Sequence, residues 1–239
     1  AADPELPDVT LDVLGAESEG MVGYLLAQAL GDHLDPASVV TLLTQVEVDA
    51  HDPAFDAPVK AIGPRYDPSV RASLEAKGWT VLDDGDGLRR VVPSPEPQRI
   101  VELAAIRLLS DEGCTVVCAG GGGIPVTEVD GRSVGVEAVV DKDLASARLA
   151  IDLGAAELVL VTGVDAVYEG WGTDQARALH RPTVEQLRAL DLPAGSMGPK
   201  VDAACRFVEA TGGVARIGAL DELDRLLAGD AGTVVGSEV

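Results

Sequence analysis

From residue 98 onward, the hydrophobic positions follow two alternating patterns. Apolar runs of strand length predict buried strands over 115–119, 158–162, 214–217 and 233–235. Apolar residues at helical spacing predict helices over 98–111, 142–153, 183–190, 198–210 and 220–228. Strands that are apolar throughout and alternate with helices are typical of a parallel sheet covered on both faces. The pattern therefore predicts an α/β fold around a mainly parallel sheet.

The residues before this region are less regular and predict a small lobe inserted into a larger domain. Four prolines over 47–68 predict a long ordered loop, because proline breaks regular elements. The other expected elements are an entry segment over 1–17, helices over 18–30 and 69–76, a strand over 38–46, and hairpins pairing 79–82 with 89–92 and 126–129 with 134–136. We expect one domain over 1–239, with a protruding lobe over 48–93.

Charge excludes two classes of partner. The 239 residues include 18 Lys and Arg against 40 Asp and Glu, a formal net charge of −22. Such a surface repels phosphate backbones and anionic lipids, so we expect neither nucleic acid nor a membrane as partner. Either a high-salt cytoplasm or a GC-rich genome would explain the imbalance. The three cysteines fit no zinc-binding spacing and predict free thiols in a reducing cytoplasm.

A run of four glycines, Gly120–Gly123, follows the predicted strand 115–119. Ligands in open α/β sheets bind beyond the carboxyl ends of the strands. A stretch without Cβ atoms lets backbone N–H groups approach an anion closely. The run therefore favours an anion site, with a tight flexible turn as the alternative. The end of strand 158–162 is also placed to line a ligand.

Lysine is rare enough to be considered position by position, since the chain has 4 Lys and 14 Arg. Lys142 and Lys200 each stand at a predicted helix start, where a cation opposes the helix dipole unless an anion binds there. A polyphosphate would resolve this conflict, and a lysine can follow a phosphoryl group in transfer. The alternative is solvated lysines paired with Asp141, Asp143 or Asp202. The sequence has no Walker A motif and no metal-binding spacing, which favours phosphoryl transfer by positioning and charge.

Seven stretches, in the same order along the chain, resemble the carbamate kinases of the amino acid kinase family. They are 14–25, 43–46, 60–64, 89–95, 120–125, 135–146 and 195–200. Gly-Gly-Gly-Gly-Ile-Pro and Asp-Lys-Asp are the most specific of these motifs. The resemblance implies a three-layer αβα sandwich and a homodimer. It also implies reversible phosphoryl transfer between ATP and carbamate, giving carbamoyl phosphate and ADP, often in arginine deiminase-type catabolism.

The resemblance further implies roles for individual residues. Lys142 and Lys200 would contact the phosphates and the phosphoryl group in flight, and Asp143 would hold these lysines in place. Lys60, on the inserted lobe, would reach over the site, and Gly121 and Gly122 would face carbamate. The nucleotide pocket would be lined by Thr162, Asp165, Tyr168, Met197 and Lys200. Mg²⁺ would be held mainly by the nucleotide phosphates, with no metal ligands from the protein.

The chain departs from the family at its start. Family members begin with a strand and a Gly-Gly-Asn-Ala loop, and later carry a His-Gly-Asn-Gly-Pro loop, neither of which occurs here. We therefore expect an N-terminally incomplete kinase domain with reduced transfer activity. Two alternatives stay open: an inactive nucleotide-binding homologue or fragment, and another amino acid kinase acting on a carboxylate such as acetylglutamate. Retention of Lys60, Lys142 and Lys200 opposes the first, and the lobe carrying Lys60 opposes the second.

Overall fold

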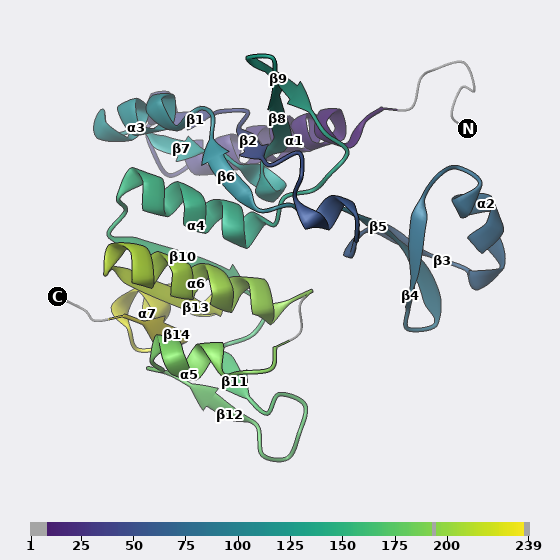
Figure 1. Cartoon of the computed structure of the whole chain (residues 1–239). Helices are drawn as coiled ribbons and strands as arrows, with labels where there is room; N and C mark the ends of the chain where they lie inside the picture. Colours follow the sequence, from purple (N-terminus) through teal and green to yellow (C-terminus); the bar gives the residue numbers. More distant parts are fainter. Residues whose placement is uncertain (1–8, 193–194, 237–239) are drawn as a thin grey trace. The chain divides into compact units, whose positions relative to one another are not determined.

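The computed structural model describes residues 9–192 and 195–236, and the chain divides into two compact units, 1–142 and 143–239 (Figure 1). The first part of the predicted entry segment, 1–8, lies outside the described residues. Among the described residues, no helix is both long and apolar enough to cross a bilayer. The predicted organisation, one domain with a lobe over 48–93, stays a prediction.

Unit 1 is built on strands that pair mostly through residues far apart in sequence. One sheet has the order β6-β2-β8-β9, with β2 (Gln45–Val48), β6 (Pro97–Ile100), β8 (Ile124–Val129) and β9 (Arg132–Gly135). β2 and β8 are parallel, as are β1 (Val39–Thr41) and β7 (Thr115–Val117). Helix α1 (Leu11–Gly31) packs on β1 and β8, and α3 (Leu103–Asp111) packs on β7. Val46, Ile100 and Val126 are buried on three adjacent strands and form part of this unit's core.

The predicted lobe contains an antiparallel sheet of order β3-β5-β4, which Figure 1 shows with α2 beside it. Its elements are β3 (Lys60–Tyr66), α2 (Arg71–Glu75), β4 (Thr80–Asp84) and β5 (Gly87–Val92). The predicted hairpin is confirmed, since β4 and β5 pair across the turn. The prediction of an unbroken loop over 47–68 is wrong at β3. Pro64 is tolerated there because the register shifts between Ile62 and Tyr66, at a bulge where the ladder needs no N–H donor.

Unit 2 holds a sheet of order β10-β13-β14 that is covered by helices. Its strands are β10 (Glu157–Thr162), β13 (Val214–Ala219) and β14 (Thr233–Val235), with β10 and β13 parallel. Its helices are α4 (Lys142–Leu153), α5 (Val184–Arg188), α6 (Met197–Thr211) and α7 (Leu223–Ala228). α6 and α7 pack on β13, and α5 packs on α6. Phe207, Ile217 and Leu187 are fully buried in the core that these elements share.

Three predicted elements in unit 1 differ from the structure, two of them because strand pairing overrides the local pattern. The predicted helix over 98–111 begins only at Leu103, since residues before it form β6 and pair with β2. The predicted strand 38–46 is interrupted between β1 and β2. Helix α1 begins at Leu11 rather than at Ser18. In unit 2, the antiparallel pair β11 (Val167–Glu169) and β12 (Arg177–Leu179) was not predicted.

Candidate active site

The glycine loop, which we define as Ala119–Gly123, adopts left-handed backbone angles over most of its length. The φ angles of Ala119, Gly121, Gly122 and Gly123 are 52°, 70°, 118° and 84°. Successive peptide groups in such conformations form concave arrays of N–H groups that suit anions. A Cβ atom at Gly122 would lie 2.2 Å from the carbonyl oxygen of Val140 and 3.3 Å from the backbone nitrogen of Lys142. The loop therefore packs directly against the backbone that leads into α4.

Lys60 is held by a carboxylate within unit 1. Its Nζ lies 2.5 Å from Oδ2 of Asp141, whose side chain is 9% exposed. Lys60 is the first residue of β3, and Asp141 immediately precedes α4. The Lys60 side chain is itself only partly exposed, at 32%. The lysine of the predicted lobe therefore pairs with Asp141, the residue that precedes Lys142 in the sequence.

Lys200 and Asp143 form a buried ion pair within unit 2. Nζ of Lys200 donates to Oδ2 of Asp143 at 2.9 Å and to Oδ1 at 3.2 Å, and both side chains are less than 10% exposed. Lys200 lies in the first turn of α6, and Asp143 in the first turn of α4. Two desolvated charges are stable only when each has its partner, so each fixes the other's position.

The sequence left open the alternative that Lys142 and Lys200 are solvated and paired with Asp141, Asp143 or Asp202. The structure corrects this alternative on two points. Lys200 is paired with a carboxylate but is buried, not solvated. Asp202 instead pairs with arginines, at 3.4 Å from Arg188 and 2.8 Å from Arg206. Lys142 is the first residue of α4, which confirms the predicted helix start, and its side chain is exposed.

The predicted nucleotide residues lie at the end of β10 and at the start of α6. Thr162 ends β10, and Asp165 follows in the next loop. The hydroxyl of Tyr168, on β11, donates to both carboxylate oxygens of Asp165 at 3.0 Å, which raises the pKa of the phenol. The Tyr168 ring meets Trp171 edge-on, with 5.1 Å between centroids. Met197 begins α6, and its place beside a nucleotide stays a prediction.

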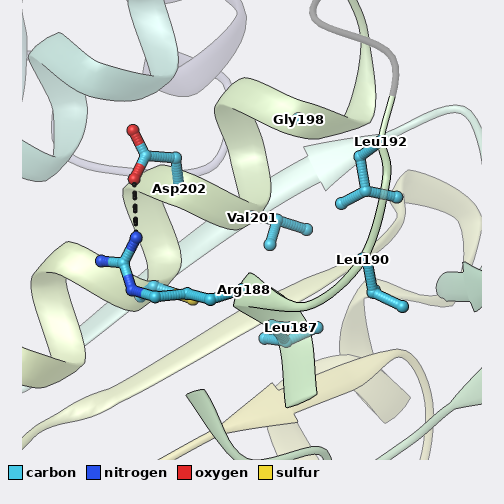
Figure 2. A pocket seen from close by; sticks show the side chains of 8 residues that line it. Leu187, Arg188, Leu190, Leu192, Gly198, Val201 and Asp202 are labelled. Carbon is cyan, nitrogen blue, oxygen red and sulfur yellow. Dashed lines mark hydrogen bonds and ion pairs between the residues drawn. The ribbon is translucent and has the colours of Figure 1, made fainter. Parts of the chain in front are cut away.

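An open pocket of about 210 Å³ lies beside α5 and α6 (Figure 2). Its rim carries the Arg188–Asp202 ion pair, and its apolar wall includes Leu190 and Val201. The full lining is Leu187, Arg188, Leu190, Leu192, Gly198, Val201, Asp202 and Cys205. None of the predicted nucleotide residues is among them, so this pocket is not the predicted nucleotide site.

Among the described residues, no group of three His, Cys, Asp or Glu side chains is placed to hold a metal ion.

Glu19 of α1 is buried beneath Gly120, although the sequence did not predict it to lie near the site. Its neighbours Glu17 and Ser18 are also polar, so nothing in the sequence distinguishes the buried position.

Comparison with known proteins identifies the family. The model of the amino acid kinase family matches residues 2–218. A carbamate kinase from Rhizobium meliloti (strain 1021) is 50% identical over 232 residues, covering 95% of this chain and 72% of the relative. A carbamate kinase from Escherichia coli (strain K12) is 50% identical over 232 residues, covering 97% and 77%.

A solved structure agrees with these sequences. The carbamate kinase from Giardia lamblia bound to AMP-PNP has a TM-score of 0.88 and 36% identity, over 98% of this chain and 78% of that one. The expected α/β fold is thereby confirmed as the fold of this family, and the alternative of an amino acid kinase for another carboxylate has no support. The chain belongs to the amino acid kinase family and, within it, to the carbamate kinases.

Proposed function

We propose that the protein transfers a phosphoryl group reversibly between ATP and carbamate, giving ADP and carbamoyl phosphate. As a member of the carbamate kinases it is a phosphotransferase. The observation that carries the assignment to particular residues is the pairing of two lysines. Lys60 pairs with Asp141 and Lys200 pairs with Asp143, and these two carboxylates flank Lys142 in the sequence.

The chemistry follows from the charge of the transferred group. A phosphoryl group in flight spreads negative charge over three oxygens, so catalysis depends on positioned cations. A lysine ammonium group is a compact charge that can follow the group as it moves. We assign this contact to Lys142 and Lys200, with Lys60 reaching the same group from β3. Asp143 is a positioning residue, because its carboxylate holds Lys200 and leaves the substrate to the lysine.

The glycine loop and the β10 end would bind the two substrates. We assign the carbamate side to Gly121 and Gly122, because the left-handed backbone of the loop suits an anion. The Gly121 N–H would be the donor, since the Gly122 N–H donates to the carbonyl oxygen of Ala119 at 3.1 Å. We assign the nucleotide to Thr162, Asp165, Tyr168 and Met197, together with Lys200. The AMP-PNP complex of the Giardia relative supports a nucleoside triphosphate as substrate. Mg²⁺ would enter as part of the nucleotide substrate, bound mainly to its phosphates.

The test is a comparison of phosphoryl acceptors on the complete gene product. ADP release from ATP is measured with carbamate and with acetylglutamate, at equal concentration. We expect release with carbamate and background release with acetylglutamate. The reverse preference would assign the protein to a different amino acid kinase reaction. If the protein binds nucleotide but releases no ADP from ATP with either acceptor, the result would support the inactive homologue instead.

The remaining partners follow from surface properties. Small molecules are the substrates, and the net charge of −22 opposes nucleic acid binding. Cys114, Cys118 and Cys205 are free thiols, which supports a reducing cytoplasm as the location.

We also propose a homodimer formed through α1. The apolar residues of this helix are spread around its axis rather than gathered on one face, so packing within unit 1 leaves many of them exposed. Its exposed apolar side chains are Val13, Leu14, Met21, Val22, Tyr24, Leu25 and Leu26. Contiguous exposed apolar surface marks protein interfaces, and a second copy would cover it symmetrically.

Replacing Leu25 by glutamate is expected to convert the dimer to a monomer. The side chain is 56% exposed, so the change would leave α1 folded while placing a charge in the apolar interface. Sedimentation velocity on the complete gene product measures the mass of each form. Leu108→Glu is the matched control, since Leu108 is 63% exposed on α3. A monomeric parent, or a Leu25→Glu variant that remains dimeric, would contradict this interface.

A further inference from the structure

Glu19 is a buried carboxyl group placed under the first glycine of the glycine loop. Its residue is 4% exposed, and a Cβ atom at Gly120 would lie 3.5 Å from its Cγ. Oε2 accepts a hydrogen bond from the backbone N–H of Thr44 at 2.8 Å. Oε1 is buried and accepts no hydrogen bond of normal geometry from the described residues, although the backbone N–H of Gly120 is close enough to stabilise the charged carboxylate. An unsatisfied buried carboxyl oxygen costs stability, so its position beneath an anion-binding loop requires a functional explanation.

Thr44 connects this carboxyl group to both ends of the glycine loop. The backbone N–H of Ala119 donates to Oγ1 of Thr44 at 2.9 Å, and the N–H of Ile124 donates to its carbonyl oxygen at 2.8 Å. Thr44 is fully buried, and its own hydroxyl donates to the carbonyl oxygen of Leu42 at 3.0 Å. Thr44 therefore accepts hydrogen bonds from Ala119 and Ile124 at the two ends of the loop, and donates its own backbone N–H to Glu19.

The surroundings of Glu19 favour its uncharged form. Burial is the largest effect and raises the pKa of this carboxyl group to about 7. The backbone N–H of Thr44 lowers the pKa, the negative charge of Glu102 raises it, and the backbone N–H of Gly120 lowers it. Glu102 itself accepts hydrogen bonds from the backbone and side chain of Gln45. Cys118 also faces Glu19, and the pKa of its thiol is raised to about 11, chiefly by burial, so it stays uncharged.

We propose that Glu19 is a positioning residue of the glycine loop, and that its charge controls how tightly the loop binds an anionic substrate. The inference rests on the proposed function, because it takes this loop to receive the carbamoyl or phosphoryl group. Uncharged Glu19 supports the loop through Thr44 without repelling an anion. Ionised Glu19 places a negative charge directly beneath the loop that binds the anion. Affinity for carbamoyl phosphate therefore falls as pH rises through neutrality, whereas affinity for ADP does not.

The variant Glu19→Gln tests this directly, since glutamine keeps the acceptor for the Thr44 N–H and cannot ionise. Calorimetry on the complete gene product gives Kd for carbamoyl phosphate and for ADP at pH 6 and pH 8. In the parent, Kd for carbamoyl phosphate should rise by about tenfold from pH 6 to pH 8. This is the order of effect expected for a nearby unit charge in a partly screened site. In Glu19→Gln this Kd should stay at the parent's pH 6 value. Glu17→Gln, an exposed neighbour on α1, should keep the parent's pH dependence.

A stability measurement separates this inference from the proposed function. A carboxyl group whose folded pKa is raised stabilises the fold fully below its unfolded pKa, and that contribution is lost as pH rises through about 7. The urea midpoint of the parent should therefore fall relative to that of Glu19→Gln between pH 5 and pH 8. An equal pH dependence of Kd or of midpoint in the two proteins would overturn the inference. A pH-dependent Kd in a protein that transfers no phosphoryl group would support the role of Glu19 in anion binding while overturning the proposed reaction.

Discussion

Lys200→Met is expected to lower phosphoryl transfer by about 10²–10³-fold, because it removes a positioned cation from the transferring group. It should also destabilise unit 2 by about 3–5 kcal/mol, because it breaks the buried ion pair with Asp143. Initial rates of ATP formation from carbamoyl phosphate and ADP measure the first effect. Urea unfolding of the same protein measures the second.

A double variant separates these two effects. Lys200→Met combined with Asp143→Asn removes both charges, so much of the lost stability should return. Transfer should remain low, because the cation is still absent. Lys77→Met is the matched control, since Lys77 is an exposed lysine that lies over the Trp79 ring of the lobe. Recovery of transfer in the double variant would mean that Lys200 acts only in folding.

Gly122→Ala is expected to distort the glycine loop and to lower transfer by about 10²-fold, since small misplacements of binding groups cost this much. The added Cβ would lie 2.2 Å from the carbonyl oxygen of Val140, which is backbone and cannot rotate away. The φ of 118° adds a strain of about 1–3 kcal/mol for a residue with a side chain. Rates and thermal unfolding midpoints measure the two effects.

Gly113→Ala provides the control for backbone strain alone. Gly113 follows α3 with a φ of 83°, and a Cβ there would meet nothing within 4 Å. It should lose about 1–2 kcal/mol of stability and keep its transfer rate. If Gly122→Ala behaves in the same way, the close approach of the loop to Val140 is not needed for activity.

The parts of the fold that could be predicted are those whose pattern is local. α4, α6 and β14 bury apolar residues at regular spacing, and the structure confirms them to within a residue or two. β6 could not be predicted, because its residues are strand-forming only through pairing with β2, about fifty positions earlier. β3 was missed because Pro64 indicates a loop unless the bulge that accommodates it is known.

The candidate site could be predicted only as far as rare residues marked it. Lysine is scarce in this chain, so Lys60, Lys142 and Lys200 stood out, and the glycine run marked the loop. Their partners could not be chosen, because 40 acidic residues are available and the two pairs join positions 81 and 57 apart. Glu19 was missed for a related reason, since its burial depends on the packing of α1 against the glycine loop.

The most direct test of this account is ³¹P NMR of the complete gene product with carbamoyl phosphate, ADP and Mg²⁺. The account predicts that the carbamoyl phosphate signal is replaced, mole for mole, by the γ-phosphate signal of ATP. Lys200→Met should leave the carbamoyl phosphate signal in place over the same time, and Lys77→Met should not. Release of inorganic phosphate in place of ATP by the parent protein, or ATP formation by Lys200→Met at the parent's rate, would contradict it.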